Sequence, residues 1–207
     1  FLYIFGYGAS KLFIKNNNIF FSIPLGLAIY SSLSLDINYI VGFGYVQSIL
    51  IIISCIVISY ICGFKTKVQE KINKLDVVSI IICVLASIIV STGVILKFHD
   101  GNYFSSIQLL DHSKISLINS INRNGLPLVN PFSLTSPSDP IAHYYFLWYL
   151  VAANVSCIFN ISGWMSDVVL TQITSLASLT LIIGLIKELN VWNIKNSILC
   201  FLSVFSI

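Results

Sequence analysis

The sequence predicts an all-α polytopic membrane protein: a transmembrane helix bundle with an extracytoplasmic loop that carries an amphipathic surface helix. Of its 207 residues, 57% are hydrophobic and only 9% are charged, whereas a soluble domain carries about 25% charged residues. Apolar runs of roughly 20 residues, the length that crosses a bilayer as a helix, recur along the chain. One long polar stretch, residues 97–140, interrupts them.

By this length criterion, five spans are expected at about residues 19–35, 37–62, 76–96, 141–159 and 166–186. A truncated span ends near Ile14 and another begins near Ile194, so we expect a fragment of a longer protein that forms a single transmembrane domain over residues 1–207. Only Asp36 separates the first two runs, and Pro24 lies in the first. These two runs alternatively form a re-entrant hairpin or one kinked element.

Lysines predict the orientation of the chain in the plasma membrane. Four lie in the Lys-rich segment, residues 65–74, and short Lys-rich loops face the cytoplasm. Residues 97–140 are then extracytoplasmic. If the spans are counted back from this segment, Lys11 and Lys15 lie in the cytoplasm, as the positive-inside rule expects. If they are counted forward, Lys187 and Lys195 lie outside, against this rule.

The composition also excludes some partners and sites. The net charge is only +3 and the basic residues are scattered, so no stripe is available to bind a nucleic-acid backbone. Membrane lipid is the expected partner. All five cysteines lie in apolar runs without C-x-x-C spacing, which is typical of small buried hydrophobic residues. Asp36, Asp76 and Asp167 lie at span ends, where helix capping explains them.

The outer loop contains one amphipathic helix, expected to begin near Asp111. At about 100° per residue its apolar and polar positions fall on opposite faces: Ile115, Leu117, Ile118 and Ile121 against His112, Ser116, Asn119 and Arg123. Such a helix is expected to lie flat on the membrane surface. Gly125 and Pro127 end it, since glycine adopts the left-handed conformation and proline prevents continuation.

The residues after this helix form an extended strap. Pro127, Pro131, Pro137 and Pro140 do not fit into one helix, so the chain should follow the surface until His143 opens the next span. Apolar residues such as Leu128 favour a folded outer cap over a disordered loop.

This loop resembles that of the type C superfamily of glycosyltransferases, notably uncharacterised bacterial and archaeal members. The matching pattern is Asp111 followed by a surface helix, then "NRNGLPLVNPF", then "HYYFLWYLVAA" re-entering the membrane, within residues 76–186. Enzymes of this superfamily take sugar from a polyprenyl-phosphate carrier on the outer or lumenal side of the membrane. Many members carry paired acids where this chain has Asp111 followed by His112.

The catalytic candidates are two carboxylates. Inverting transfer needs a base that takes the proton of the acceptor hydroxyl, and Asp111 is the first candidate. Alternatively, Asp111 is the N-cap of the surface helix. Asp100 is the second candidate base, and it alternatively serves as a turn residue in "HDGN".

The other polar residues of the loop are candidates for binding the donor. His112, His143 and Asp139 carry side chains that can ligate a divalent cation together with Asp111, and this cation would bind the phosphate of the donor. The spacing of these residues does not by itself indicate a metal site. Arg123 and Lys114 are candidates for binding the phosphate of the donor. Alternatively, their side chains extend to lipid head groups. His143 and Tyr144 begin a span, where they equally suit an interfacial aromatic belt.

The sequence therefore predicts a membrane glycosyltransferase that uses a polyprenyl-phosphate sugar donor, with Asp111 as the base. The alternative is a non-enzymatic transporter or scaffold of an envelope polysaccharide system, in which the loop only gates or docks. A proton-coupled transporter is disfavoured because the spans hold almost no mid-membrane charge. A surface-polysaccharide polymerase or ligase ranks lower still, because Arg123 is the chain's only arginine.

Overall fold

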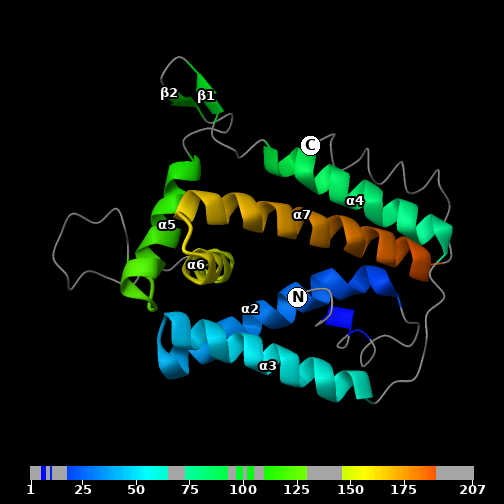
Figure 1. Ribbon diagram of the computed structural model, residues 1–207, viewed down its shortest axis with the longest axis horizontal. Coiled ribbons are helices and arrows are strands. Elements are labelled where there is room, and N and C mark those ends of the chain that lie inside the picture. Colours follow the sequence, from blue (N-terminus) through cyan, green and yellow to red (C-terminus); the bar gives the residue numbers. More distant parts are fainter. Residues whose placement is uncertain are drawn as a thin grey trace. The chain divides into compact units, whose positions relative to one another are not determined.

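The computed structural model describes residues 6, 7, 10, 18–64, 73–92, 97–99, 102–104, 110–129 and 146–189, with the backbone alone at 62–64, 97–99, 102–104 and 110–112. This part of the chain is helical apart from one short hairpin (Figure 1), which confirms the all-α prediction. Its elements are the 3₁₀-helix η1 (Ile19–Phe21), the helices α2 (Ser22–Val41), α3 (Tyr45–Phe64), α4 (Lys74–Thr92), α5 (Leu110–Asn124), α6 (Leu147–Phe159) and α7 (Gly163–Glu188), and the strands β1 (Lys97–His99) and β2 (Asn102–Phe104).

Three segments within these ranges have the length and composition of membrane spans: Ile19–Val41, Lys74–Thr92 and Gly163–Glu188. Helices α3 and α4 also expose large aliphatic side chains along their length, including Ile53, Ile56, Ile81, Leu85 and Ile89. Water does not favour apolar faces of this size, whereas lipid does. The chain is therefore a helical membrane protein.

The boundary between the first two spans is not at Asp36, which lies exposed within α2. The helix continues to Val41, and the chain reverses at Gly42 and Gly44, whose φ angles are +83° and +151°. Only glycine adopts such angles readily, whereas one exposed carboxylate does not end a helix. Pro24 lies in the first turn of α2, where proline needs no N–H partner, so the alternative of one element kinked at Pro24 is not required.

The chain forms two compact units, and α2, α3, α4 and α7 contribute to both. Unit 1 comprises residues 1–29, 55–89 and 173–207. Its core packs α4 against the second half of α7 around Phe20 of η1, through Cys83, Ala86, Leu179 and Ile183. Small residues bring the backbones close together. A Cβ added at Gly184, for example, would lie 3.2 Å from the Cβ of Phe20.

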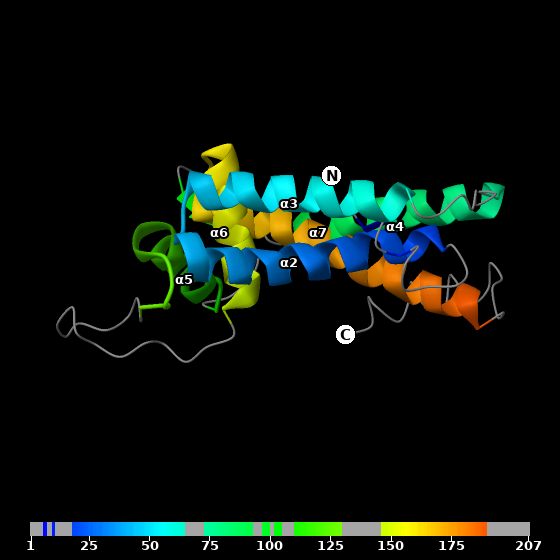
Figure 2. The same ribbon diagram turned by 90° about the horizontal axis from the view of Figure 1, so that it is seen from below.

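Unit 2 comprises residues 30–54 and 90–172, and α6 forms its centre. Leu150, Ala152, Ala153 and Asn154 of α6 are fully buried. Helix α6 is seen end-on in Figure 1 and upright in Figure 2, so within this unit it runs across the direction of α2 and α3. Its 13 residues extend only about 20 Å, too short for the bilayer core. The span expected at 141–159 is therefore, in its described part, a buried transverse helix.

Candidate functional site

The predicted outer helix is α5, which begins at Leu110 and ends at Asn124. Gly125 has a φ of +70°, and its N–H donates to the carbonyl of Ile121 at 2.8 Å. This is the left-handed glycine ending that the sequence predicts. Both ends of the helix thus lie within one residue of their expected positions.

The apolar face of α5 is covered by protein. Ile118 and Ile121 have no exposed surface and Leu117 is also buried, and α5 packs directly against α6. The expectation of a helix lying flat with this face on lipid was therefore wrong. Periodicity identified the apolar face correctly, but the periodicity of a helix does not specify whether lipid or protein covers it.

The polar face of α5 also makes specific contacts within unit 2. Asn119, expected to point away, lies against the start of α7, where a Cβ added at Gly163 would be 2.5 Å from Asn119 Oδ1. One turn later, Asn122 Nδ2 donates to Ser156 Oγ of α6 at 3.0 Å. Ser120 Oγ donates to the carbonyl of Val129 at 3.0 Å, which holds the start of the strap. Helix α5 is therefore docked by polar contacts as well as apolar ones.

The first candidate base, Asp111, is in the first turn of α5 together with His112. The helix begins at Leu110, one residue before the expected start. The side chains of both residues lie outside the described part of the chain. Their catalytic and binding roles remain predictions.

The other candidates are not all close to Asp111. Arg123 is exposed in the last turn of α5, 12 residues and thus about 18 Å along the helix from Asp111. Arg123 and Asp111 therefore lie near opposite ends of α5, and the binding role of Arg123 stays a prediction. Lys114 is half-buried three residues after Asp111, a spacing that places two side chains on the same face of a helix.

Three candidates lie outside the described residues: Asp100, His143 and Tyr144, as does the suggested ligand Asp139. The strands beside Asp100 pair antiparallel, with His99 opposite Asn102. Within the described residues, no group of three or more His, Cys, Asp or Glu side chains is arranged to hold a metal ion.

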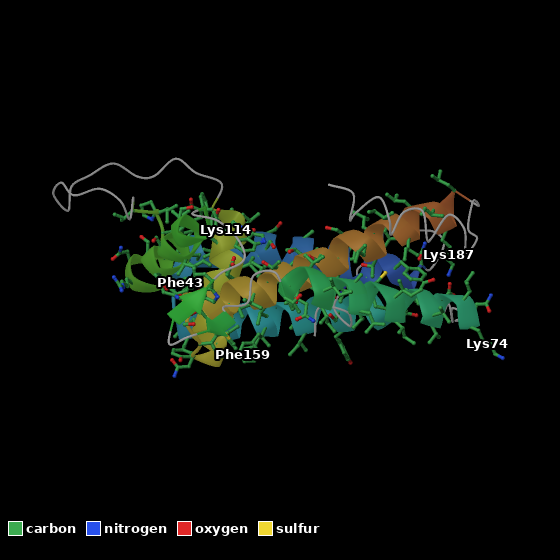
Figure 3. The ribbon with its side chains drawn as sticks, turned by 90° about the horizontal axis from the view of Figure 1, so that it is seen from above. Phe43, Lys74, Lys114, Phe159 and Lys187 are labelled. Carbon is green, nitrogen blue, oxygen red and sulfur yellow. The ribbon has the colours of Figure 1, made fainter. Side chains whose placement is uncertain are left out.

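One buried ion pair in unit 1 was missed by the sequence analysis. Both carboxylate oxygens of Asp76, in the first turn of α4, lie 3.1 Å from Lys187 Nζ in the last turn of α7. Asp76 Oδ2 also accepts the N–H of Asn73 at 3.0 Å. Asp76 therefore caps the start of α4 as predicted, and it pairs with Lys187 in addition. Lys187 Nζ lies 5.5 Å from the ring centre of Phe20. In Figure 3, Lys74 and Lys187 lie toward the same end of this unit.

A buried polar seam in unit 2 was also missed. Gln47 Nε2 of α3 donates to the carbonyl of Ser34 in α2 at 3.1 Å, and Asn154 Nδ2 of α6 donates to Ser34 Oγ. All three residues are fully buried. Asp167 is buried as well, in the second turn of α7 rather than at its cap. The available signal was the presence of Ser, Asn and Gln inside apolar runs, since membrane helices use these residues as interhelical hydrogen-bonding groups.

Comparison with known proteins gives one informative relative. No family model matches the chain, and no solved structure matches it. The chain is similar to the uncharacterized protein y4nK of Sinorhizobium fredii, with 26% identity over 185 residues that cover 85% of this chain and 27% of that protein. The chain thus spans 27% of the length of this curated relative.

Proposed function

We propose that this chain is part of an integral membrane glycosyltransferase that transfers sugar from a polyprenyl-phosphate donor to an acceptor hydroxyl at the extracytoplasmic face of the plasma membrane. The observation that supports this proposal most is α5, the helix expected in the outer loop. It packs on α6, and Asp111 is in its first turn. A catalytic carboxylate needs to be held on a rigid element close to its substrate, and a docked helix is such an element.

In the proposed reaction, the acceptor oxygen attacks the anomeric carbon of the donor. Asp111 takes the proton of that hydroxyl as the new glycosidic bond forms. The bond from the anomeric carbon to the phosphate oxygen breaks, and polyprenyl phosphate leaves with the bonding electrons. Lys114, three residues after Asp111, supplies positive charge near the leaving phosphate.

The orientation of the helices supports an outer location for α5. Helix α4 begins at Lys74, directly after the Lys-rich segment that we assign to the cytoplasm. Asp76, near this start, is paired with Lys187 near the end of α7. Helix α7 begins at Gly163, which contacts α5. The 26 residues of α7 extend about 39 Å, enough to cross the bilayer.

We infer that Lys187 lies on the cytoplasmic side, as the positive-inside rule expects. The apolar run at 141–159 predicted a further crossing, which placed Lys187 outside. The 13 described residues of α6 are too short for a crossing, so in our proposal α7 is the next crossing after α4. Lys187 and the Lys-rich segment then lie in the cytoplasm, and α5 lies outside.

The test is sugar transfer by the full-length protein in membranes, with polyprenyl-phosphate sugars as donors. Asp111→Asn should lower transfer at least about 100-fold at equal protein abundance, since general-base catalysis contributes that much or more. Asp36→Asn makes the same chemical change at an exposed position of α2 and should leave transfer unchanged. Full activity of Asp111→Asn, or no transfer by the unsubstituted protein from any polyprenyl-phosphate sugar, would contradict the proposal.

The second candidate is a transporter or scaffold of an envelope polysaccharide system. The buried seam of Ser34, Gln47 and Asn154 favours it, because polar side chains inside a membrane bundle also line translocation pathways. This candidate predicts that Asn154→Leu abolishes export of the polysaccharide while no transfer reaction is detectable. The transfer assay with the Asp111 variant therefore separates the two functions.

A further inference from the structure

The docking of α5 depends on a short chain of hydrogen bonds that starts at Asn122. Its Nδ2 donates to Ser156 Oγ at 3.0 Å, and the Ser156 hydroxyl donates in turn to the carbonyl of Ile161 at 2.6 Å. A serine hydroxyl has one proton and two acceptor sites, so it accepts from Asn122 and donates to Ile161 at the same time. Helix α5 is thus connected through α6 to the turn that precedes α7.

Ser156 also fixes this turn through its backbone. Its carbonyl accepts the N–H of Asn160, a residue with a left-handed φ of +51°, and the N–H of Ile161 at 3.1 Å. Two residues later the chain reaches Gly163, which lies against Asn119 of α5. The turn at 160–163 therefore contacts α5 directly at Asn119 and is connected through Ser156 to Asn122. Asn119 and Asn122 are about one helical turn apart on the same face of α5.

Contacts along α5 are concentrated in its second half. Residues 117, 118, 120 and 121 are buried, whereas residues 113–116 are half-buried. Asp111 lies beyond this half, about 16 Å along the helix from Asn122. A rotation or shift of α5 at its docked half would therefore displace the Asp111 end of the helix.

We propose that Asn122 and Ser156 are positioning residues that fix the rotation and depth of α5 and thereby place Asp111 over the sugar donor. This inference rests on the proposed transferase function. Apolar contacts alone permit a helix to slide or rotate, because they are not directional. The hydrogen bond from Asn122 to Ser156 is directional, and Asn119 lies against Gly163, so these two contacts specify the rotation of α5 where the apolar contacts do not.

The test compares Asn122→Ala and Ser156→Ala with Ser156→Thr in the full-length protein. Amide exchange of residues 113–124 should become about threefold to tenfold faster in both alanine variants, as expected for the loss of one net hydrogen bond. Their kcat should fall with an unchanged KM for the donor, because the misplaced group acts only in the transition state. Ser156→Thr keeps the hydroxyl and should restore both values.

Ser87→Ala is the matched control. Ser87 is also a fully buried serine, but its hydroxyl donates to the carbonyl of Val84 in its own helix. This variant should alter neither the exchange of α5 nor kcat.

Unchanged α5 exchange in both alanine variants would refute the docking role. Faster exchange with unchanged kcat would make the contact purely structural and refute the positioning role. Absence of transfer by the unsubstituted protein would refute the proposed function and the positioning role with it, while the exchange data would still decide the docking role.

Discussion

Replacing Lys187 by Met should destabilise the protein more than replacing Asp76 by Asn, although the two side chains form one ion pair. Their surroundings differ, since the side chain of Asp76 is 3% exposed and that of Lys187 is 28% exposed. Lys187→Met leaves a buried carboxylate without its counter-charge. Asp76→Asn leaves an ammonium group that reaches water through its flexible stem, and the new amide oxygen can still accept the N–H of Asn73.

The size of the difference follows from these surroundings. Breaking a fully buried ion pair costs about 3–5 kcal/mol when a charge is left in the interior, so we expect about 3 kcal/mol for Lys187→Met. For Asp76→Asn we expect about 1 kcal/mol, the cost of one exchanged hydrogen bond. The difference of about 2 kcal/mol corresponds to roughly a thirtyfold change in the unfolding equilibrium constant. The double variant should cost less than Lys187→Met alone, because it leaves no unpaired charge.

The assay is SDS-induced unfolding of the full-length protein in mixed micelles, followed by loss of helical circular dichroism. Lys74→Met serves as the control, because Lys74 is exposed in the same turn of α4 as Asp76, and it should shift stability by less than about 0.5 kcal/mol. Equal costs for the two single variants would refute the reasoning. If the stability loss of the double variant equalled the sum of the two single losses, the two side chains would not be energetically coupled.

The remaining predictions concern the end of α5 and the cysteines. Gly125→Ala should lower stability more than Gly42→Ala. Both substitutions place alanine at a positive φ, which costs about 1 kcal/mol. Of the two new Cβ atoms, only the one at Gly125 meets another group, Phe43 Cβ at 3.3 Å. Equal losses in the same SDS titration would contradict this. Peptide mass spectrometry after maleimide treatment should find the partly exposed Cys157 modified before the fully buried Cys55, and the reverse order would contradict the assigned burial.

The end of α5 was predictable because its signals are local. Gly125 and Pro127 each restrict their own backbone, so the sequence alone specifies where the helix stops. The reversal after α2 is equally local, but the boundary was expected at the charge of Asp36 instead of at the glycines at 42 and 44. Asp36 is an exposed position within a helix, whereas the positive φ angles of the two glycines mark the turn.

The tertiary contacts were not predictable from one sequence. Asp76 and Lys187 are 111 residues apart, and no periodic pattern specifies which helices pair or in which register. The same holds for Asn122 and Ser156, whose pairing depends on the transverse direction of α6. Composition predicted a hydrophobic segment there, but the described helix is too short for a span, and residues 149–154 in its middle are buried by protein on all sides.

The most direct test of the account is to locate α5 and the end of α7 relative to the membrane. Cysteines would be introduced by Arg123→Cys in α5, by Leu189→Cys after α7 and by Lys74→Cys at the start of α4, all exposed positions. In a background in which the native cysteines are replaced by serine, a membrane-impermeant maleimide applied to intact cells should label only Arg123→Cys, and the other two should react only after permeabilisation. Labelling of Leu189→Cys together with Arg123→Cys in intact cells would contradict the crossing of α7. Failure of Arg123→Cys to react until the cells are permeabilised would contradict the outer position of α5.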